Sequence, residues 1–127
     1  MDQHRIEYGL NNFKKLSGKE DNPFASLGDL GDYILEYGFG DIYGRDTISW
    51  RDRQISTMSI QIVMGCIPQF KLHARFSLNI GITKEEIFEL ILHTTPYAGF
   101  PRAMNAHKAF EELLDSLSSN DNTGGER

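Results

Sequence analysis

The chain has 127 residues, of which 39% are hydrophobic, and a net charge of −5, which suits one globular domain with a real core. The negative charge argues against a general nucleic-acid binder, because phosphate contacts need clustered Lys and Arg that the sequence does not show. The single cysteine excludes an internal disulfide or a Cys-rich zinc site, and the histidines at positions 4, 73, 93 and 107 show no metal-binding spacing.

Apolar residues are spread along the chain rather than collected in one long run. No run approaches the roughly 20 residues needed to cross a bilayer, and the N-terminus MDQHRIEYG is too polar for a signal peptide. We therefore expect a cytoplasmic protein with no membrane partner. The final segment SSNDNTGGER is polar and lacks apolar residues, so we expect a single domain over residues 1–119 and a disordered tail over residues 120–127.

Two helical patterns occupy the first part of the chain. Residues 2–16 place apolar side chains at helical spacing, and SGKEDNP ends the pattern. The apolar positions from Pro23 to about Tyr43 also follow a helical period, but four glycines in that range argue against one unbroken helix. The segment YGRDTIS is then expected to be a loop, in which Ser49 is the N-cap of the next helix.

The segment from Arg51 to Thr83 is the centre of the chain, and its pattern predicts two helices that meet at a corner. The first helix is apolar on most sides, which is typical of a helix enclosed by others, and Gly65 ends it. Cys66 and Pro68 start the second helix, where Pro68 lies in the first turn and its missing N–H costs nothing.

Two further helices are predicted after the central segment. Thr83 and Glu86 have the spacing of a capping box at the start of the first of them. Pro96 is expected to interrupt this helix, and Gly99 supplies a C-terminal signal. Pro101 then starts the last helix, in which apolar residues recur at steps of three and four and give a strongly amphipathic element.

The fold class follows from these patterns. No stretch shows an alternation of period two between hairpin turns, so the sequence predicts an all-α fold of about six helices. Several helices have apolar residues on more than one side, which is more than a small monomeric bundle would bury. We therefore expect the subunits to pack together.

One helical stripe in the centre of the chain carries unusual chemistry. It combines a thiol, an amide and an imidazole above two apolar residues, and the side chains at these helical intervals are those of Cys66, Gln69, His73, Phe76 and Ile80. We interpret this stripe as the wall of a pocket.

Four segments of the chain together resemble the carboxymuconolactone decarboxylase family, within the alkylhydroperoxidase D-like fold. They are FGDIYGR, RDRQIST, QFKLHARFSLNIGITKEEIFE and YAGFPRAMNA, and the match covers roughly residues 28 to 114. The resemblance implies an all-helical subunit with helical hairpins at its centre, assembled as a ring-like homohexamer or a homotrimeric arrangement. It also implies a site between helices, near subunit contacts.

The peroxide-reducing branch of this fold carries Cys-x-x-Cys followed by x-x-x-His, with an upstream Glu as proton relay. In this chain the same motif begins with Cys66 and ends with His73, but Gln69 occupies the position of the second Cys. Without the second sulfur no intramolecular disulfide can close the redox cycle. Gln54 stands where the relay Glu would be, and an amide cannot exchange a proton at neutral pH. These departures argue against a thiol peroxidase.

The decarboxylase branch needs no metal, flavin or thiol, so the resemblance implies no cofactor. Its reaction removes CO2 from 4-carboxymuconolactone, a step in aromatic compound catabolism, and needs a group that holds carboxylates and an acid that delivers a proton to carbon. His73 matches the family's His and is expected to be the proton donor. Arg53 could pair with a substrate carboxylate, and Gln54, Gln69, Cys66 and Tyr97 are expected to line the pocket.

Two alternatives stay open at this point. The first is a non-catalytic or small-molecule-binding oligomer that kept the fold but lost its proton relay at Gln54. The second is a thiol-dependent peroxide-reducing protein that uses Cys66 alone, with an external thiol to resolve its sulfenic acid. The main hypothesis is a carboxy-lyase that acts on a small lactone or carboxylate, with His73 and Arg53 as catalytic residues.

Overall fold

The computed structural model describes residues 2–123, with side chains from residue 2 to residue 119. No strand occurs within this described range, which confirms the predicted all-α fold. Among the described residues, none of the helices is both long and apolar enough to span a membrane. The elements in chain order are α1 (Gln3–Ser17), the 3-10 turn η1 (Ala25–Leu27), α2 (Asp29–Tyr33), the π-helical segment η2 (Ile34–Ile42), α3 (Trp50–Met64), α4 (Ile67–Asn79), α5 (Lys84–Ala98) and α6 (Phe100–Thr123).

The chain divides into two compact units, residues 1–53 and residues 54–127. Helix α3 begins in the first unit and continues into the second. The expectation of a single domain over residues 1–119 stays a prediction. Each unit is described here by itself.

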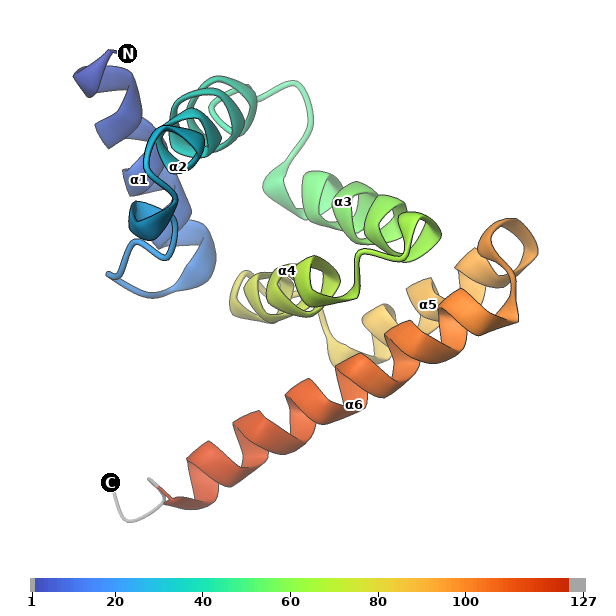
Figure 1. The fold of residues 1–127 in the computed structure, drawn as a ribbon. Coiled ribbons are helices and arrows are strands. Elements are labelled where there is room, and N and C mark those ends of the chain that lie inside the picture. Colours follow the sequence, from blue (N-terminus) through green and yellow to red (C-terminus); the bar gives the residue numbers. More distant parts are fainter. Residues whose placement is uncertain (1, 124–127) are drawn as a thin grey trace. The chain divides into compact units, whose positions relative to one another are not determined.

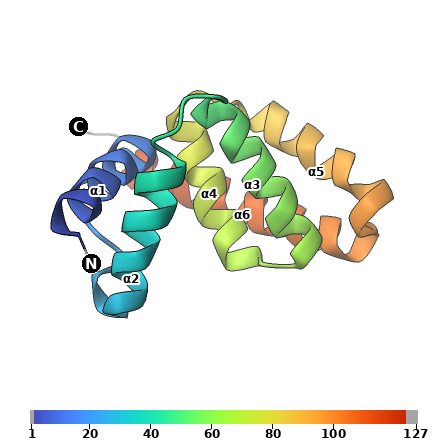
Figure 2. The same ribbon diagram turned by 90° about the horizontal axis from the view of Figure 1, so that it is seen from above.

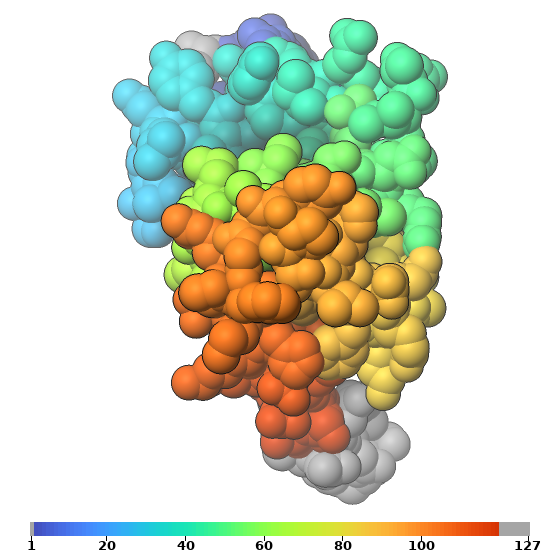
Figure 3. Space-filling model, turned by 90° about the vertical axis from the view of Figure 1, so that its right-hand side faces the viewer, coloured from blue at the N-terminus to red at the C-terminus, as the bar shows by residue number. Residues whose placement is uncertain are grey.

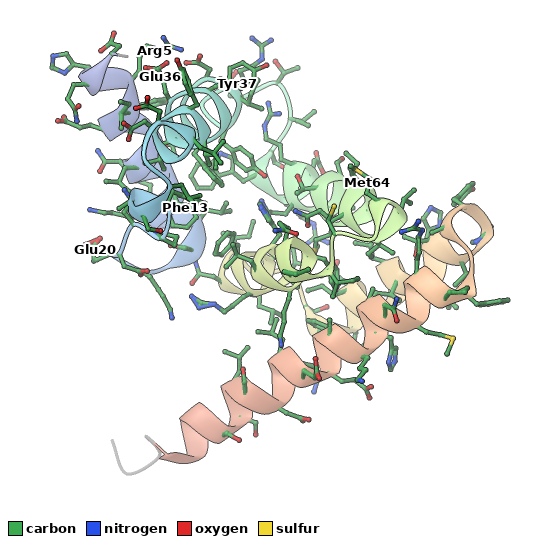
Figure 4. The ribbon with its side chains drawn as sticks, viewed as in Figure 1. Arg5, Phe13, Glu20, Glu36, Tyr37 and Met64 are labelled. Carbon is green, nitrogen blue, oxygen red and sulfur yellow. The ribbon has the colours of Figure 1, made fainter. Side chains whose placement is uncertain are left out.

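In the N-terminal unit, α1 lies against η2 (Figure 1). The two helices approach closely at Gly9, where an added Cβ would lie 1.8 Å from the Leu35 carbonyl oxygen, so only glycine fits. Phe13, labelled in Figure 4, is 2% exposed, and its ring meets the edges of Phe24 and Phe39, each at a centroid distance of 5.0 Å. A small aromatic core therefore holds this unit together.

The N-terminus of α1 is tied to η2 by charge. The Asp2 side chain accepts from the backbone N–H groups of the first turn, as expected of an N-cap. The Arg5 Nη1 lies 3.5 Å from a carboxylate oxygen of Glu36, the two residues labelled at the top of Figure 4. Arg5 also pairs with Asp41. Asp41 and Glu36 raise the Arg5 pKa, with Asp41 the larger cause.

The glycine-rich segment is helical but not continuous, as its sequence indicated. Gly28 has a φ of +60° between η1 and α2, a conformation that favours glycine. From Ile34 to Ile42 the chain adopts a π-helix. A wider helix of this kind is rare and is commonly found at functional sites.

In the C-terminal unit, α3 and α4 form one antiparallel pair and α5 and α6 another (Figures 1 and 2). Their buried core joins all four helices, through Met58, Ile62, Phe70, Ala74, Ile82, Ile87, Ile91, Ala103, Ala106, Phe110 and Leu113. The turns between them follow the predicted signals. Gly65 ends α3 with a φ of +74°, and Pro68 lies in the first turn of α4. Thr83 and Glu86 form the predicted capping box of α5.

Two helix ends differ from the sequence-based expectation. Helix α5 is not interrupted at Pro96 but continues to Ala98 and ends at Gly99. Proline removes the bond that residue 96 would donate to the Leu92 carbonyl, and the Thr95 hydroxyl donates to that carbonyl instead, over 2.8 Å. The prediction of a helix break was wrong because this neighbour replaces the missing donor.

The last helix is longer than expected. Helix α6 runs to Thr123, so residues 120–123 of the expected tail continue the helix. The remaining tail residues, 124–127, lie outside the described part of the chain.

Candidate active site

A hydrogen bond joins the adjacent helices α3 and α4 of the C-terminal unit. His73 lies on α4, and its Nδ1 is 3.1 Å from the Oε1 of Gln54 on α3. Gln54 is completely buried. The Phe76 ring packs against the His73 imidazole in an edge arrangement, with ring centroids 5.2 Å apart. The sequence placed His73 and Gln54 in one pocket, and the structure joins them directly.

Ser77 is a third member of this network, which sequence reasoning missed. Its hydroxyl lies 2.7 Å from the His73 carbonyl oxygen, one helical turn earlier, and 3.3 Å from the Gln54 Oε1. It also lies 3.5 Å from the Met58 sulfur, and Ser77 has no exposed surface. The sequence feature that could have identified Ser77 is its spacing, because a residue four positions after His73 lies on the same helix face.

The contact with Gln54 assigns the tautomer of His73. An amide oxygen only accepts hydrogen bonds, so with Oε1 facing the ring the Nδ1 carries the proton and donates it. In the neutral ring the lone pair is then on Nε2. Proton exchange at His73 is therefore directed to Nε2, while Nδ1 fixes the orientation of the ring.

Burial sets the charge of His73. It lowers the pKa of the imidazole from 6.5 to about 4, because the cation loses hydration. The ring of the free protein is therefore neutral at pH 7. A carboxylate in the place of Gln54 would stabilise the imidazolium. The neutral amide carries no charge, so it does not offset the effect of burial on the His73 pKa.

The other predicted lining residues lie at the ends of helices. Cys66 is the N-cap of α4 and is partly exposed, with its backbone N–H bonded to the Gln61 carbonyl over 2.8 Å. Gln69 is exposed in the first turns of α4. Tyr97, near the end of α5, is 74% exposed, and its ring lies 5.6 Å from that of His93. The structure thus places Tyr97 beside His93, outside the Gln54–His73–Ser77 network.

Arg53 is the last residue of the N-terminal unit, directly before Gln54 on α3. Its Nη2 donates to the Arg45 carbonyl oxygen over 3.4 Å. Its Nε is buried and has no hydrogen-bond partner among the described residues. The guanidinium therefore keeps a donor that a bound anion could use.

A cavity of about 330 Å³ adjoins the network through Met58. Its lining is mostly apolar and also includes Glu86, Glu89 and His93. A larger groove of about 500 Å³ between α5 and α6 shares no residue with the network. Within the described residues no group of His, Cys, Asp and Glu side chains is arranged to hold a metal ion.

The chain was compared with known families and proteins. The model of the carboxymuconolactone decarboxylase family matches residues 28–112, a range that contains every site residue predicted above. The 4-carboxymuconolactone decarboxylase of Acinetobacter baylyi is 29% identical over 123 residues, which cover 91% of each chain.

Two further relatives match a shorter part of the chain. The nitrosuccinic acid decarboxylase of Metarhizium robertsii is 28% identical over 95 residues, which cover 75% of this chain and 65% of that protein. An uncharacterised 15.0 kDa protein of Paracoccus denitrificans is 31% identical over 75 residues, covering 58% of this chain and 56% of its own. With a family match over most of its length and two relatives named as decarboxylases, the chain belongs to the carboxymuconolactone decarboxylase family.

Proposed function

We propose that the protein is a cofactor-free decarboxylase of 4-carboxymuconolactone or a related small lactone or carboxylate, in which His73 delivers the proton. The observation that carries this proposal is the hydrogen bond from His73 to the buried Gln54, which fixes the ring and directs its exchangeable proton to Nε2. The likeness to two named decarboxylases supports the reaction class.

The reaction needs one proton per turnover. The bond between the carboxylate carbon and the lactone carbon breaks, CO2 leaves, and the electron pair is delocalised into the unsaturated lactone. A new C–H bond then forms with a proton from the Nε2 of His73, and solvent restores that proton. Gln54 holds Nδ1–H throughout and exchanges no proton itself.

The low pKa of His73 makes substrate binding part of this scheme. In the free protein the ring is neutral at pH 7, because burial holds its pKa near 4. A substrate that brings carboxylates next to the ring favours the imidazolium and raises that pKa. The acid is thus formed together with the anionic complex, where it is needed.

Arg53 is proposed as the carboxylate anchor, because a guanidinium can bind a carboxylate with two parallel hydrogen bonds. Its buried Nε without a partner among the described residues supports this role. Gln54, Gln69, Cys66 and Tyr97 are proposed to line the substrate site. We further propose that the protein is located in the cytoplasm and takes part in the breakdown of aromatic compounds.

We also propose that the protein acts as a homohexamer or homotrimer. The support is a set of exposed apolar side chains in the C-terminal unit, some of which lie near the turn between α5 and α6. This turn faces the viewer in Figure 3. Leu92, Phe100 and Met104 are each more than 60% exposed there and line the 500 Å³ groove. Burial of such side chains between copies would remove apolar area from water.

The name of one relative suggests a second substrate class. Nitrosuccinic acid, like an unsaturated lactone acid, can delocalise the electron pair left by CO2, in this case into its nitro group. The same proton donor would then complete the reaction at carbon. Both substrates should therefore be assayed together.

The test is the release of CO2 by the purified protein from 4-carboxymuconolactone and from nitrosuccinate, beside the variants His73→Gln and Cys66→Ser. Turnover that is lost in His73→Gln and kept in Cys66→Ser supports the proposal. If neither substrate is turned over above the buffer rate, the proposed reaction is wrong for these substrates. Peroxide reduction that is lost in Cys66→Ser would favour the single-cysteine alternative instead.

A further inference from the structure

We propose that the N-terminal unit contains a separate binding site for a small aromatic carboxylate. The site is a cavity of about 360 Å³, at the small end of the range of ligand cavities and large enough for one substituted ring. This inference does not depend on the decarboxylase proposal, because none of its residues belongs to the Gln54–His73–Ser77 network. It lies entirely within the N-terminal unit.

Three aromatic side chains from different segments line this cavity. Tyr8 comes from α1, Tyr43 follows the end of η2, and Trp50 is the first residue of α3. Such rings offer flat apolar surface on which another ring can stack, at a small cost in conformational entropy. The remaining lining residues are Asn12, Gly44, Arg45, Asp46, Ile48 and Ser49.

Two residues of the cavity wall, Trp50 and Asn12, are held in place before any ligand arrives. The Trp50 indole N–H donates to the Tyr43 carbonyl oxygen over 2.7 Å, and the two rings meet at an angle with centroids 6.2 Å apart. Asn12 is 7% exposed and donates to the Phe39 carbonyl over 2.8 Å. A site with fixed walls loses little free energy to ordering when it binds.

Gly44 keeps Tyr8 in position. A Cβ at Gly44 would lie 2.7 Å from the Tyr8 hydroxyl oxygen and 2.5 Å from the Gly40 carbonyl oxygen. Only a residue without a side chain lets the phenol lie against this turn. Glycine is therefore required here by these close contacts in the cavity wall and not by a positive φ.

The charges favour an anion with a specific orientation. Arg45 lines the cavity, and its guanidinium forms no ion pair with any described residue. Asp46 is the one acidic group of the lining, so a ligand hydroxyl could donate to it while a carboxylate pairs with Arg45.

The α3 N-terminus is not the source of this preference. The Ser49 hydroxyl already accepts from the Asp52 N–H over 3.0 Å, so it caps the helix without a ligand. The predicted ligand class follows from the rings and the guanidinium together, namely a single aromatic ring that bears a carboxylate and a hydroxyl.

Trp50 makes the test direct, because it is the only tryptophan of the chain. The full-length protein labelled with 15N gives one indole N–H signal in a proton–nitrogen NMR spectrum, and this signal is followed during titration with 4-hydroxybenzoate. We expect a saturable shift with a Kd below about 1 mM. Cyclohexanecarboxylate, which has the charge without the aromatic ring, and 4-hydroxybenzamide, which has the ring without the charge, should each bind at least about tenfold more weakly.

Variants separate this site from surface charge and from the active site. Arg45→Gln and Gly44→Ala should each weaken 4-hydroxybenzoate binding at least about tenfold, by loss of the guanidinium and by displacement of Tyr8. Lys19→Gln, which removes an exposed charge elsewhere in the same unit, should leave the Kd unchanged. His73→Gln should also leave it unchanged, even if it abolishes decarboxylation.

The outcomes are decisive in both directions. A shift that does not saturate, an equal affinity for cyclohexanecarboxylate, or an unchanged Kd in Arg45→Gln overturns the proposal. A Kd that rises in His73→Gln would assign the observed binding to the decarboxylase site and also overturn it. Binding that is lost only in Arg45→Gln and Gly44→Ala supports it.

Discussion

The Nδ1 of His73 and the Oε1 of Gln54 lie 3.1 Å apart, and the Gln54 side chain is completely buried. Gln54 provides an acceptor for the ring but no charge, so burial alone determines the His73 pKa, which is about 4. The orientation of the imidazole and its charge state are thus controlled by different features of the site. This separation can be tested by changes at position 54.

Gln54→Glu should raise the pKa of His73. A carboxylate at this contact distance favours the imidazolium, and we expect an increase of about two pKa units or more, with the two groups titrating as a pair. The pKa is measured from the NMR shifts of the His73 ring protons between about pH 3 and pH 9. Gln54→Met is the control for loss of the hydrogen bond without added charge. If the His73 pKa stays near 4 in Gln54→Glu, the side chain at position 54 does not contact the His73 ring.

His73 should also make stability depend on pH in a defined window. Its pKa is 6.5 in the unfolded chain and about 4 in the folded protein, so between these values the unfolded state binds more protons. The free energy of unfolding should therefore fall as the pH drops from about 6.5 to about 4, by roughly 3 kcal/mol from this residue alone. Above pH 6.5 the ring is neutral in both states and contributes no slope.

The measurement is urea unfolding at a series of pH values for the parent protein and for His73→Gln. Carboxylates contribute to acid destabilisation in both proteins, so the difference between the two curves isolates His73. That difference should change only between about pH 4 and pH 6.5. Parallel curves across this window would contradict the low folded-state pKa.

Local signals along the chain predicted the helix boundaries well. Ser49, Gly65, Pro68 and the capping box of Thr83 act through their own backbone neighbourhood, and the structure confirms each of them. Such caps depend on residues within one turn, which the sequence displays directly. The all-α fold followed from the same patterns.

Features that depend on a partner in space were harder to predict. The break expected at Pro96 does not occur, because Thr95 replaces the lost donor to Leu92. His73 and Gln54 are joined by a hydrogen bond, but the loss of hydration that lowers the His73 pKa depends on surrounding helices. The spacing from His73 placed Ser77 on the same helix face, but the contacts of its hydroxyl with Gln54 and Met58 exist only because α3 lies beside α4.

Ser77→Ala should destabilise the protein modestly and loosen the site. It removes a buried hydroxyl that donates to the His73 carbonyl and touches the Gln54 Oε1, and we expect a loss of about 1 kcal/mol in the free energy of unfolding. We also expect a lower kcat with a nearly unchanged KM, because the effect on catalysis acts through the orientation of His73.

The matched control for Ser77→Ala is Ser59→Ala. Ser59 lies on α3, and its hydroxyl also donates to a carbonyl four residues earlier, that of Ile55, over 2.9 Å. Its loss removes the same kind of hydrogen bond without touching Gln54 or His73. A drop in kcat of equal size in both variants would show that Ser77 has no special role in positioning the ring.

Gly9→Ala should disrupt the N-terminal unit. Helix α1 and η2 approach so closely that the new Cβ would lie 1.8 Å from the Leu35 carbonyl oxygen and 2.6 Å from its carbon, which are rigid backbone atoms. The helices must separate, and we expect a loss of about 2 to 3 kcal/mol, after the gain of roughly 1 kcal/mol in helix propensity from alanine is subtracted.

Gly38→Ala is the matched comparison for this change. Gly38 lies in η2, in the same unit, but a Cβ there would meet no atom within 4 Å. The substitution should therefore be neutral or slightly stabilising, because it only reduces the conformational entropy of the unfolded chain. The measurement is the midpoint of urea unfolding for the two variants and the parent protein. Equal midpoints for Gly9→Ala and Gly38→Ala would mean that α1 and η2 do not pack at this close distance.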